Sequence, residues 1–228
     1  MSKSTYFTSR SDFKRVVDSP CGTKVSIFLF SIPKAEKKIQ QKRWQKNILS
    51  YLHDLVFGLV GILLVFMLLF RMVVVSGPSM MQTLQDGDRL ILLSNVLYTN
   101  PKYGDIVVAS KESFKDGEPI IKRVIATEGQ EVDIDFDKGI VYVDGVALDE
   151  PYTNTPTNLV EGTRFPLVVE EGCVFVLGDN RNDSLDSRSH EIGQIDKREL
   201  LGKAIFLAFP GVDAQTQKRD MNRIGVLW

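Results

Sequence analysis

The chain contains few of the residues that bind metals or form disulfides. Its 228 residues include two cysteines, Cys21 and Cys173, and two histidines, His53 and His190. Zinc sites are usually built from Cys and His residues at short spacings, and the sequence has no such cluster. A nucleophile activated by histidine would depend on one of these two histidines. The sequence therefore predicts no metal centre and no other cofactor.

The chain also lacks a surplus of charge of either sign. Lys and Arg number 28 and Asp and Glu number 29, which gives a net charge of −1. A domain that binds nucleic acid usually carries a marked basic surplus or a basic stripe. The sequence therefore predicts no nucleic-acid partner. The basic residues near the N-terminus are explained by the orientation of a membrane helix, as described below.

One long apolar run is present, LVFGLVGILLVFMLLF from Leu55 to Phe70, and it carries no charge. Arg71 interrupts it before Met72–Val75 extends the apolar character. A bilayer core needs about 20 mostly apolar residues in a helix, and residues 55–75 reach that length with Arg71 snorkelling to the interface. A buried core helix is one alternative. A cleaved signal peptide is another, but it would lie within roughly the first 30 residues, so we favour a transmembrane helix.

Basic residues before this helix set its expected orientation. Six Lys and Arg residues lie between Lys34 and Lys46, and no basic cluster follows Val75. Positive residues stay on the cytoplasmic side, so we expect a single-pass protein of the cell membrane with its N-terminus in the cytoplasm. Residues 1–54 then form a basic cytoplasmic tail, largely disordered, with a basic helix over residues 35–46. The lipid bilayer is an expected partner.

The same topology restricts the chemistry of the chain. Cys21 and Cys173 would lie on opposite sides of the membrane, so no structural disulfide is expected. His53 lies at the cytoplasmic end of the helix, and His190 lies in a polar loop. A serine nucleophile beyond the helix would therefore take its base from a carboxylate or a lysine.

Residues 76–228 are enough for one domain with its own core, and they consist of short β-type runs separated by Gly and Asp turns. Val132–Phe136 alternates apolar and acidic residues, turns at Asp137–Gly139 and returns over Ile140–Val143. Such spacing predicts an antiparallel β-sheet or barrel-like domain, so the fold class is mainly β with one N-terminal transmembrane helix. Residues 149–163 are predicted to form an exposed loop. The other expected strands are 89–93, 106–109, 120–127, 165–169, 173–177 and 201–209.

A candidate nucleophile follows the apolar run directly, in the segment Ser76–Leu84, which reads SGPSMMQTL. The hydroxyl of Ser79 needs a base, and Lys122 is the candidate because it shares a strand face with Ile120 and Val124. Burial on that face would lower the lysine pKa toward the roughly 7–8 that suits a base. A lysine that snorkels to water at a sheet edge is the alternative, and the strand pattern alone favours it.

A third segment, Gly178–Arg188, combines opposite charges and hydroxyls in the sequence GDNRNDSLDSR. This density suits a buried network of Asp–Arg ion pairs and hydroxyl hydrogen bonds. A solvated loop has a similar composition, so the segment alone is suggestive.

Taken in order, these segments resemble those of the type I signal peptidases, membrane-bound serine proteases with a Ser–Lys dyad. Ser79–Leu84 resembles the nucleophile box and Gly104–Val108 the short strand box that follows it. Lys122–Ala126 is similar to the box that carries the base. Gly178–Arg188, followed by Leu201–Ala204, matches the most specific box. The resemblance extends from the apolar run to about residue 209.

The resemblance implies a serine endopeptidase of the single-span form that removes signal peptides from exported preproteins outside the cytoplasm. It implies Ser79 as the nucleophile and Lys122 as the general base, with Ser184 hydrogen-bonded to the lysine amine. It also implies that Asp186 and Arg188, together with Arg181, form an ion-paired scaffold that holds their loop against the dyad.

The resemblance leaves the oxyanion site and the substrate pocket less well defined. The Ser79 backbone N–H is the implied first oxyanion donor. Some members of the family carry a hydroxyl two residues before the nucleophile, where this chain has Gly77, so Ser76 is the candidate second donor. Shallow apolar subsites in the family accept small residues such as alanine before the cut. The residues that align with these subsites are Leu84, Ile120 and Ile121.

Three alternatives fit parts of the pattern. An inactive paralogue would bind preproteins or a translocation partner; the complete set of catalytic residue types argues against it, while Gly77 leaves room for it. The self-cleaving Ser–Lys repressor-type proteases have a similar β core, but they carry an N-terminal DNA-binding domain and no membrane helix. A membrane-anchored β-domain with a structural role would show no proteolysis.

Overall fold

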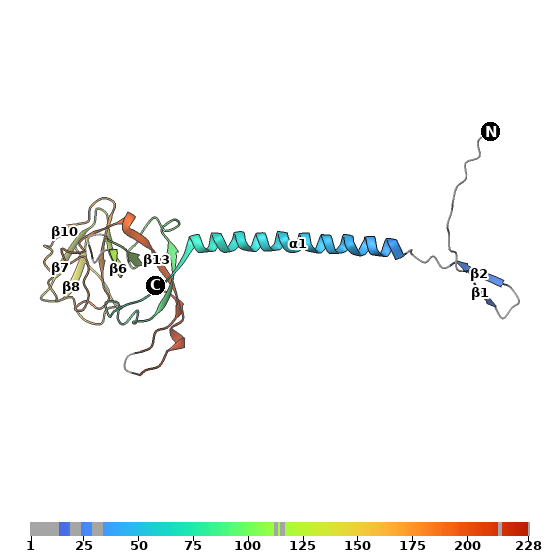
Figure 1. Ribbon diagram of the computed structural model, residues 1–228. Helices are drawn as coiled ribbons and strands as arrows, with labels where there is room; N and C mark the ends of the chain where they lie inside the picture. The colour runs from blue at the N-terminus through green and yellow to red at the C-terminus, as the bar shows by residue number, and fades with distance from the viewer. Residues whose placement is uncertain are drawn as a thin grey trace, which may run out of the picture. The chain divides into compact units, whose positions relative to one another are not determined.

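The computed structural model describes residues 14–18, 24–28, 34–111, 114, 117–213 and 216–227. The chain divides into two compact units, Met1–Gly61 and Ile62–Trp228. Strands and loops make up nearly all of the second unit (Figure 1). The prediction of a mainly β, antiparallel domain behind one apolar helix is therefore confirmed.

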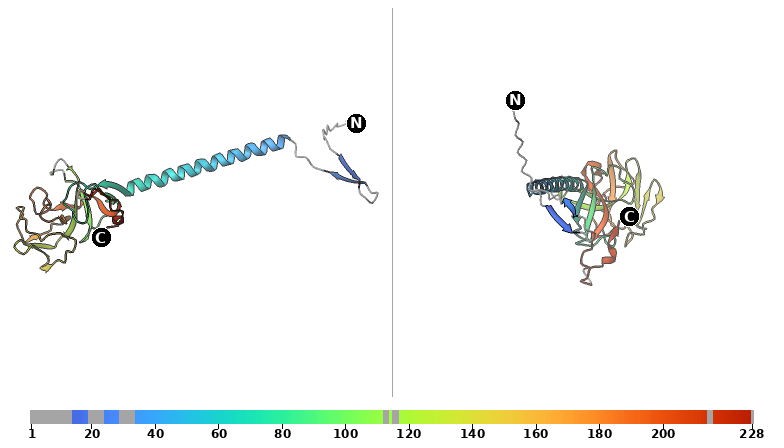
Figure 2. Two further views of the ribbon diagram at one scale, coloured as in Figure 1. Left: turned by 90° about the horizontal axis from the view of Figure 1, so that it is seen from below. Right: turned by 90° about the vertical axis from the view of Figure 1, so that its right-hand side faces the viewer.

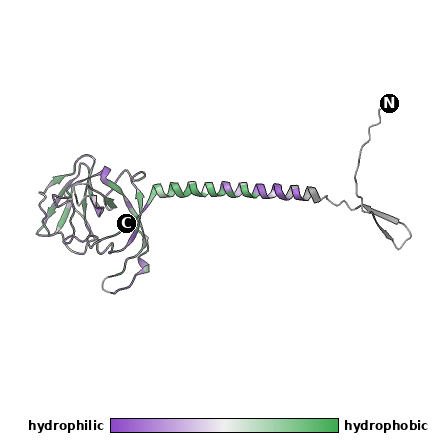
Figure 3. Cartoon of the chain, viewed as in Figure 1, coloured by the Kyte–Doolittle hydropathy of each residue, from purple (hydrophilic) through white to green (hydrophobic). Residues whose placement is uncertain are grey.

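Helix α1 spans Lys34–Leu69. Figure 3 shows that its first half is polar and its second half apolar. Its segment Gln41–Leu69 is long and apolar enough to cross a membrane. The mean hydropathy of its most apolar part is 2.4, and none of that part is buried inside the protein. At 1.5 Å per residue this segment measures about 44 Å, more than the roughly 30 Å of a bilayer core. The basic helix expected over residues 35–46 is the first part of this same helix.

The structure corrects the C-terminal end of the predicted membrane helix. The helix ends at Leu69, and Phe70–Val74 form strand β3 instead of continuing it to Val75. β3 pairs antiparallel with β4 (Arg89–Ser94). Aromatic and β-branched residues favour strands, and β4 supplies the hydrogen-bond partners for one here. Arg71, which was expected to snorkel from a helix, is an exposed residue of β3.

The structure also differs from the predicted disorder of residues 1–54. Strands β1 (Lys14–Asp18) and β2 (Lys24–Phe28) form an antiparallel pair, and both contain β-branched residues that favour pairing. The other residues before Lys34, including Cys21, lie outside the described residues.

One antiparallel sheet organises the β-domain, in the order β12-β11-β6-β5-β13-β4-β3, with β14 paired to β13. Bulges interrupt β6 where it pairs with β11, and β13 where it pairs with β4. Bulges increase local twist, so the sheet curls (Figure 2). Short 3-10 helices precede β13 (η2, Lys197–Glu199) and β14 (η3, Met221–Arg223). The remaining strands of this sheet are β5 (Ile106–Ala109), β6 (Ile120–Thr127), β11 (Cys173–Leu177), β12 (Ile195–Asp196), β13 (Leu200–Phe209) and β14 (Gly225–Val226).

A smaller antiparallel sheet has the order β10-β7-β8-β9. Its β7–β8 hairpin is the one that the sequence predicts around Asp137–Gly139. The strands of the smaller sheet are β7 (Glu131–Asp135), β8 (Ile140–Val143), β9 (Val146–Ala147) and β10 (Leu167–Val168).

Strand β6 lies at the centre of the apolar core. Ile121, Val124 and Ile125 of this strand belong to three different clusters of buried apolar side chains. Because β6 is covered on both faces, its two charged residues are buried as well: Lys122 is 4% exposed and Arg123 is 2% exposed. The fold therefore places a lysine and an arginine inside the domain, where each needs a partner.

Candidate active site

Ser79 lies in a closed loop, residues 76–88, which we call the nucleophile loop. Backbone hydrogen bonds close its base: Val75 N–H donates to Asp88 O at 2.8 Å, and Gly87 N–H donates to Val75 O at 2.9 Å. Met80, the neighbour of Ser79, is 1% exposed and anchors the loop in the core. Ser79 itself is half-buried, so its hydroxyl lies between the core and a cleft.

The polar segment Gly178–Arg188 holds this loop from the other side. Asn180 N–H donates to Ser79 O at 3.0 Å, and the Asn180 amide donates to Pro78 O at 3.1 Å. Further along the loop, the Thr83 hydroxyl donates to Asp179 Oδ2 at 2.5 Å. Both carbonyls beside the nucleophile are thus fixed by a segment about 100 residues later in the chain.

Lys122 reaches Ser79 from strand β6. Its backbone pairs with Val107 of β5, and its Nζ donates a hydrogen bond to Ser79 Oγ at 2.8 Å. The lysine at a sheet edge, which the strand pattern alone favoured, is therefore not what the structure contains. The two residues that the sequence paired are in direct contact.

Burial lowers the pKa of Lys122 from 10.5 to about 8, because the charged ammonium loses its hydration inside the domain. The negative charges of Asp186, Glu161 and Asp179 oppose this shift, and the positive charge of Arg188 adds to it. With a pKa of 8, about a tenth of the lysine is neutral at pH 7, against about one part in three thousand for an ordinary lysine. The site therefore supplies an amine that accepts protons near neutral pH.

The structure places Ser184 beside the dyad but corrects its predicted partner. Its hydroxyl donates to Asp186 Oδ2 at 2.9 Å, and among the described residues no hydrogen bond joins it to Lys122. Gly178 explains how Ser184 comes so close: a Cβ on this glycine would lie 2.1 Å from Ser184 Oγ and 2.6 Å from Ser79 O. The missing side chain lets the Ser184 hydroxyl and the nucleophile loop meet at one point.

Asp186 and Arg188 form the ion pair that the resemblance implies. Arg188 Nε donates to Asp186 Oδ1 at 2.8 Å, and both side chains are fully buried. Gly178 N–H donates to Asp186 Oδ2 at 3.0 Å, and Arg188 also donates to the carbonyls of Arg181 and Ser184. The pair therefore fixes the turn that carries Ser184.

Arg181 has a different ion-pair partner from the one expected. It forms a two-pronged pair with Glu150, at 2.6 and 2.7 Å, and donates to Thr157 Oγ1 at 2.8 Å. Both partners belong to the loop 149–163, which the sequence predicted to be exposed, yet Thr157 is 1% exposed. This loop covers the scaffold and supplies the hydrogen-bond acceptors that the buried Arg181 guanidinium needs.

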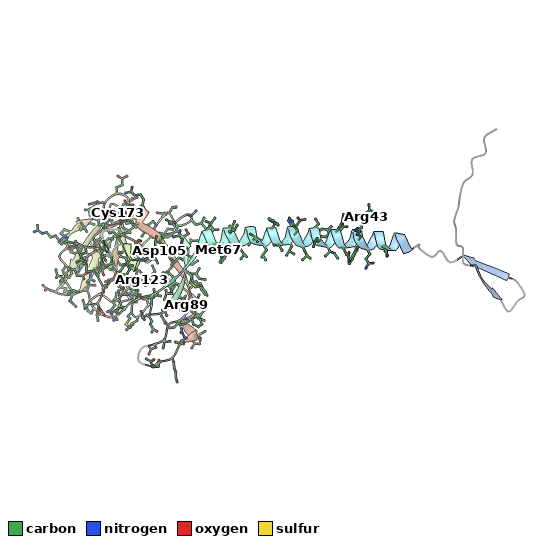
Figure 4. All side chains as sticks on the ribbon, in the orientation of Figure 1. Arg43, Met67, Arg89, Asp105, Arg123 and Cys173 are labelled. Atoms are coloured by element: carbon green, nitrogen blue, oxygen red, sulfur yellow. The ribbon has the colours of Figure 1, made fainter. Side chains whose placement is uncertain are left out.

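Arg123 and Asp179, which have no predicted role, form a second buried pair at 2.8 and 2.6 Å. Arg123 also donates to Gly104 O at 2.8 Å and lies 4.0 Å above the Tyr152 ring. Figure 4 shows Arg123 and Asp105 within the β-domain. A charged residue in the middle of an apolar strand was the signal that could have identified this pair.

Glu161 is a further residue without a predicted role. Its side chain is 12% exposed, and its Oε2 lies 3.5 Å from Arg188 Nε without a hydrogen bond among the described residues. Burial raises the pKa of Glu161 to about 7, and the charge of Asp186 adds to the rise, whereas Arg188 and Lys122 oppose it. Glu161 therefore titrates close to neutral pH beside the dyad.

A cleft of about 340 Å³ opens at Ser79 and Lys122. Ile120 and Ile121 line it, as the resemblance implies, and so does the exposed Ser76. Leu84 does not: it is 0% exposed and belongs to the core cluster beneath the nucleophile loop. Ile120 and Ile121 give this cleft an apolar wall next to the dyad.

The chain matches known proteins over most of its length. A family model described as "Signal peptidase, peptidase S26" matches residues 48–209. The chain is 33% identical over 183 residues to signal peptidase I of Bacillus licheniformis, covering 77% of this chain and 95% of that protein. It is 38% identical over 165 residues to a probable signal peptidase I-1 of Synechocystis sp., covering 67% and 80%.

Among solved structures, a signal peptidase I from Enterococcus faecalis V583 is 29% identical and covers 46% of this chain and 96% of its own, with a TM-score of 0.38.

Proposed function

This chain belongs to the signal peptidase family, peptidase S26, and we propose that Ser79 is its nucleophile and Lys122 its general base. The family makes it a serine endopeptidase that cleaves signal peptides, and a Ser/Lys dyad is characteristic of that family. The observation that carries the assignment is the 2.8 Å hydrogen bond between Lys122 Nζ and Ser79 Oγ. A serine hydroxyl in contact with a desolvated lysine can lose its proton as it attacks.

The proposed reaction uses Lys122 twice. Ser79 Oγ attacks the scissile carbonyl while neutral Lys122 takes the hydroxyl proton, and the resulting ammonium protonates the leaving amine. Water then hydrolyses the acyl-enzyme, again with Lys122 as the base. Asp186 and Arg188 act by holding the Ser184 turn against the dyad and do not exchange protons with the substrate.

The oxyanion would be bound by the Ser79 backbone N–H, which has no partner among the described residues. We propose the Ser76 hydroxyl as the second donor, because it is exposed on the same cleft. Loss of one oxyanion donor typically costs about 10²–10³ in kcat. A Ser76→Ala variant with unchanged kcat would assign the second donor to the backbone instead.

The substrates follow from the family, whose members act on signal peptides. We propose that Ile120 and Ile121 form a shallow apolar subsite that takes a small residue before the cut, because both line the cleft beside Lys122.

We also propose that α1 anchors the chain in the cell membrane with a cytoplasmic N-terminus and an extracytoplasmic catalytic domain. The apolar helix fits a membrane-anchored signal peptidase, and its polar, basic first half supports this orientation. Cysteine labelling of intact cells tests the proposal, in a variant that lacks Cys21 and Cys173. A membrane-impermeant reagent should label Val146→Cys and spare Lys42→Cys; the reverse pattern would overturn the orientation.

The activity itself is tested with purified full-length protein in detergent and a secretory preprotein with alanine before its cleavage site. We expect a mature product whose N-terminus, read by mass spectrometry, follows that alanine. Replacing the alanine by tryptophan should prevent cleavage at this bond, because the subsite is shallow. An intact preprotein with the wild-type chain would contradict the proposed function.

Glu161 should set the pH at which the enzyme becomes active. Its negative charge raises the pKa of Lys122, so Glu161→Gln is expected to lower that pKa and shift the acid limb of kcat/KM to lower pH. The effect should be largest above pH 7, where Glu161 is ionised. The measurement is the pH profile of preprotein cleavage, with Glu191→Gln, an exposed carboxylate, as the control. An acid limb that does not move in Glu161→Gln would contradict the electrostatic coupling.

A further inference from the structure

The C-terminal segment, residues 210–227, lies beyond the part of the chain that matches the family model. It leaves the sheet at the end of β13 and returns as η3 and β14, which pairs with β13 through Phe206 and Leu207 (Figure 1, red). Leu227 N–H donates to Ile205 O at 3.1 Å, and the Leu227 side chain packs against the core. Both ends of the segment are thus tied to the β-domain.

Between these ends the segment crosses the base of the nucleophile loop at very short range. A Cβ on Gly211 would lie 2.0 Å from Asp86 O and 3.0 Å from Asp88 N, so only glycine fits at this position. Gly87 faces it at the crossing. Gly211 N–H donates to Asp88 Oδ1 at 2.7 Å, which ties the segment to the loop.

Arg223 completes this contact from η3. Its guanidinium pairs with Asp88 at 2.7 and 3.0 Å. It also donates to Gln85 Oε1 at 3.0 Å and to Thr83 O at 3.2 Å. Asp88 is fully buried, whereas the Arg223 side chain is 19% exposed. One arginine from outside the family match therefore binds three residues of the loop that carries Ser79.

Asp88 connects the Arg223 guanidinium to the backbone of the nucleophile loop. Its backbone carbonyl accepts the hydrogen bond from Val75 that closes the loop, and its side chain also caps Gln85 N–H at 2.8 Å. Asp86, two residues before it, accepts a hydrogen bond from Gly77 N–H at 2.9 Å. Arg223 is thus connected to the residues just before Ser79 through its hydrogen bonds to Asp88, the short backbone stretch 86–88, and the hydrogen bonds that Val75 and Gly77 donate to that stretch.

We propose that Arg223 is a positioning residue for the nucleophile: through Asp88 it locks the loop that holds Ser79 against Lys122. The proposal rests on the proposed function, in which Ser79 attacks the scissile bond. A misplacement of about 1 Å can cost about 10²-fold in rate, so loss of the lock should lower kcat. The apolar wall of the cleft, Ile120 and Ile121, lies on β6 outside the loop, so KM should change little.

The test compares two arginines of the same segment. Arg219 donates to Pro210 O at 2.6 Å and stacks on the Phe209 ring, so it anchors the segment by contacts other than those to the nucleophile loop. Arg223→Ala is expected to lower kcat for preprotein cleavage about tenfold or more, with KM within about twofold. Arg219→Ala should leave both within about twofold, and Arg223→Lys should recover part of the lost kcat because it keeps a charge beside Asp88.

A double-mutant cycle distinguishes the lock from a loss of stability. Asp88→Asn should reproduce the loss of kcat, and the double variant Asp88→Asn/Arg223→Ala should lose no more than either single variant, since the residues act as one unit. The double variant carries no unpaired buried carboxylate, so it is expected to fold even where Arg223→Ala does not, and its kcat can then be measured. Wild-type kcat in Arg223→Ala, or in the folded double variant, would overturn the proposal. An equal loss in Arg219→Ala would overturn it as well.

Hydrogen exchange separates this inference from the proposed function. In a Ser79→Ala background, which needs no activity, Arg223→Ala should speed exchange of the Val75, Gly77 and Gly87 amides, and Arg219→Ala should not. Unchanged exchange in Arg223→Ala would overturn the lock even where the wild type cleaves preproteins. Faster exchange with an inactive wild type would instead overturn the proposed function and leave the lock supported.

Discussion

Replacing Lys122 by alanine is expected to reduce preprotein cleavage to the level of Ser79→Ala, a loss of about 10⁴-fold or more in kcat. The two residues act as one unit, because Lys122 Nζ is hydrogen-bonded to Ser79 Oγ at 2.8 Å. Without the amine, none of the described residues is hydrogen-bonded to the Ser79 hydroxyl as an acceptor for its proton. Lys122→Arg should be equally inactive, since a guanidinium does not deprotonate in proteins.

A lysine on a neighbouring strand provides the matched control. Val107 pairs with Lys122 on one side and with Lys203 on the other, so Lys203 lies two strands away at the same level of the sheet. Its partner is Asp105, outside the dyad. Lys203→Met should therefore keep most of the activity. Substantial cleavage by folded Lys122→Ala, or an equal loss in Lys203→Met, would contradict the assignment of Lys122 as the base.

Arg188→Met is expected to lower the free energy of unfolding by about 3–5 kcal/mol, because it leaves Asp186 buried without its counter-ion. Arg188 and Asp186 are both fully buried, and three backbone carbonyls also lose their donor. The turn that carries Ser184 should then lose its fixed position, so cleavage should fall as well. Urea unfolding followed by far-UV circular dichroism measures the change.

The control for this prediction is an ion pair of similar geometry on the surface. Arg198 pairs with Asp196 at 2.5 Å, but its side chain is 90% exposed. Water compensates such a pair when one member is removed, so Arg198→Met should leave the unfolding midpoint nearly unchanged. Similar midpoints for the two variants would show that the Arg188 pair contributes no more than a surface pair.

The sequence predicted the strands well because they depend on local patterns. Strand β6 covers Ile120–Thr127, as its run of apolar residues indicated. The contact between Ser79 and Lys122 followed from the ordered resemblance to the family, since strand periodicity alone favoured a surface lysine. The burial of Lys122 could not be read locally, because it depends on three clusters that meet at β6.

The predictions that differed from the structure depend on contacts between distant segments. Apart from Arg71, residues 70–74 are apolar, and they fit a helix or a strand equally well. Pairing with β4 decides for the strand. Leu84 could be assigned to a cleft or to the core, and its full burial in an apolar cluster decides for the core. Arg181 pairs with Glu150 because the loop 149–163 folds over the scaffold, which no spacing in the sequence encodes.

The most direct test of the central claim, that Lys122 is the base for Ser79, is the pH dependence of kcat/KM for preprotein cleavage by the wild-type enzyme. This quantity reports the pKa of the essential base in the free enzyme. The pKa of Lys122 lies at about 8, and the lysine must be neutral to accept a proton. We therefore predict that kcat/KM rises with pH and reaches half its maximum near pH 8. A profile that is flat from about pH 6 to 9, or a midpoint near the ordinary lysine value of about 10.4, would contradict the claim.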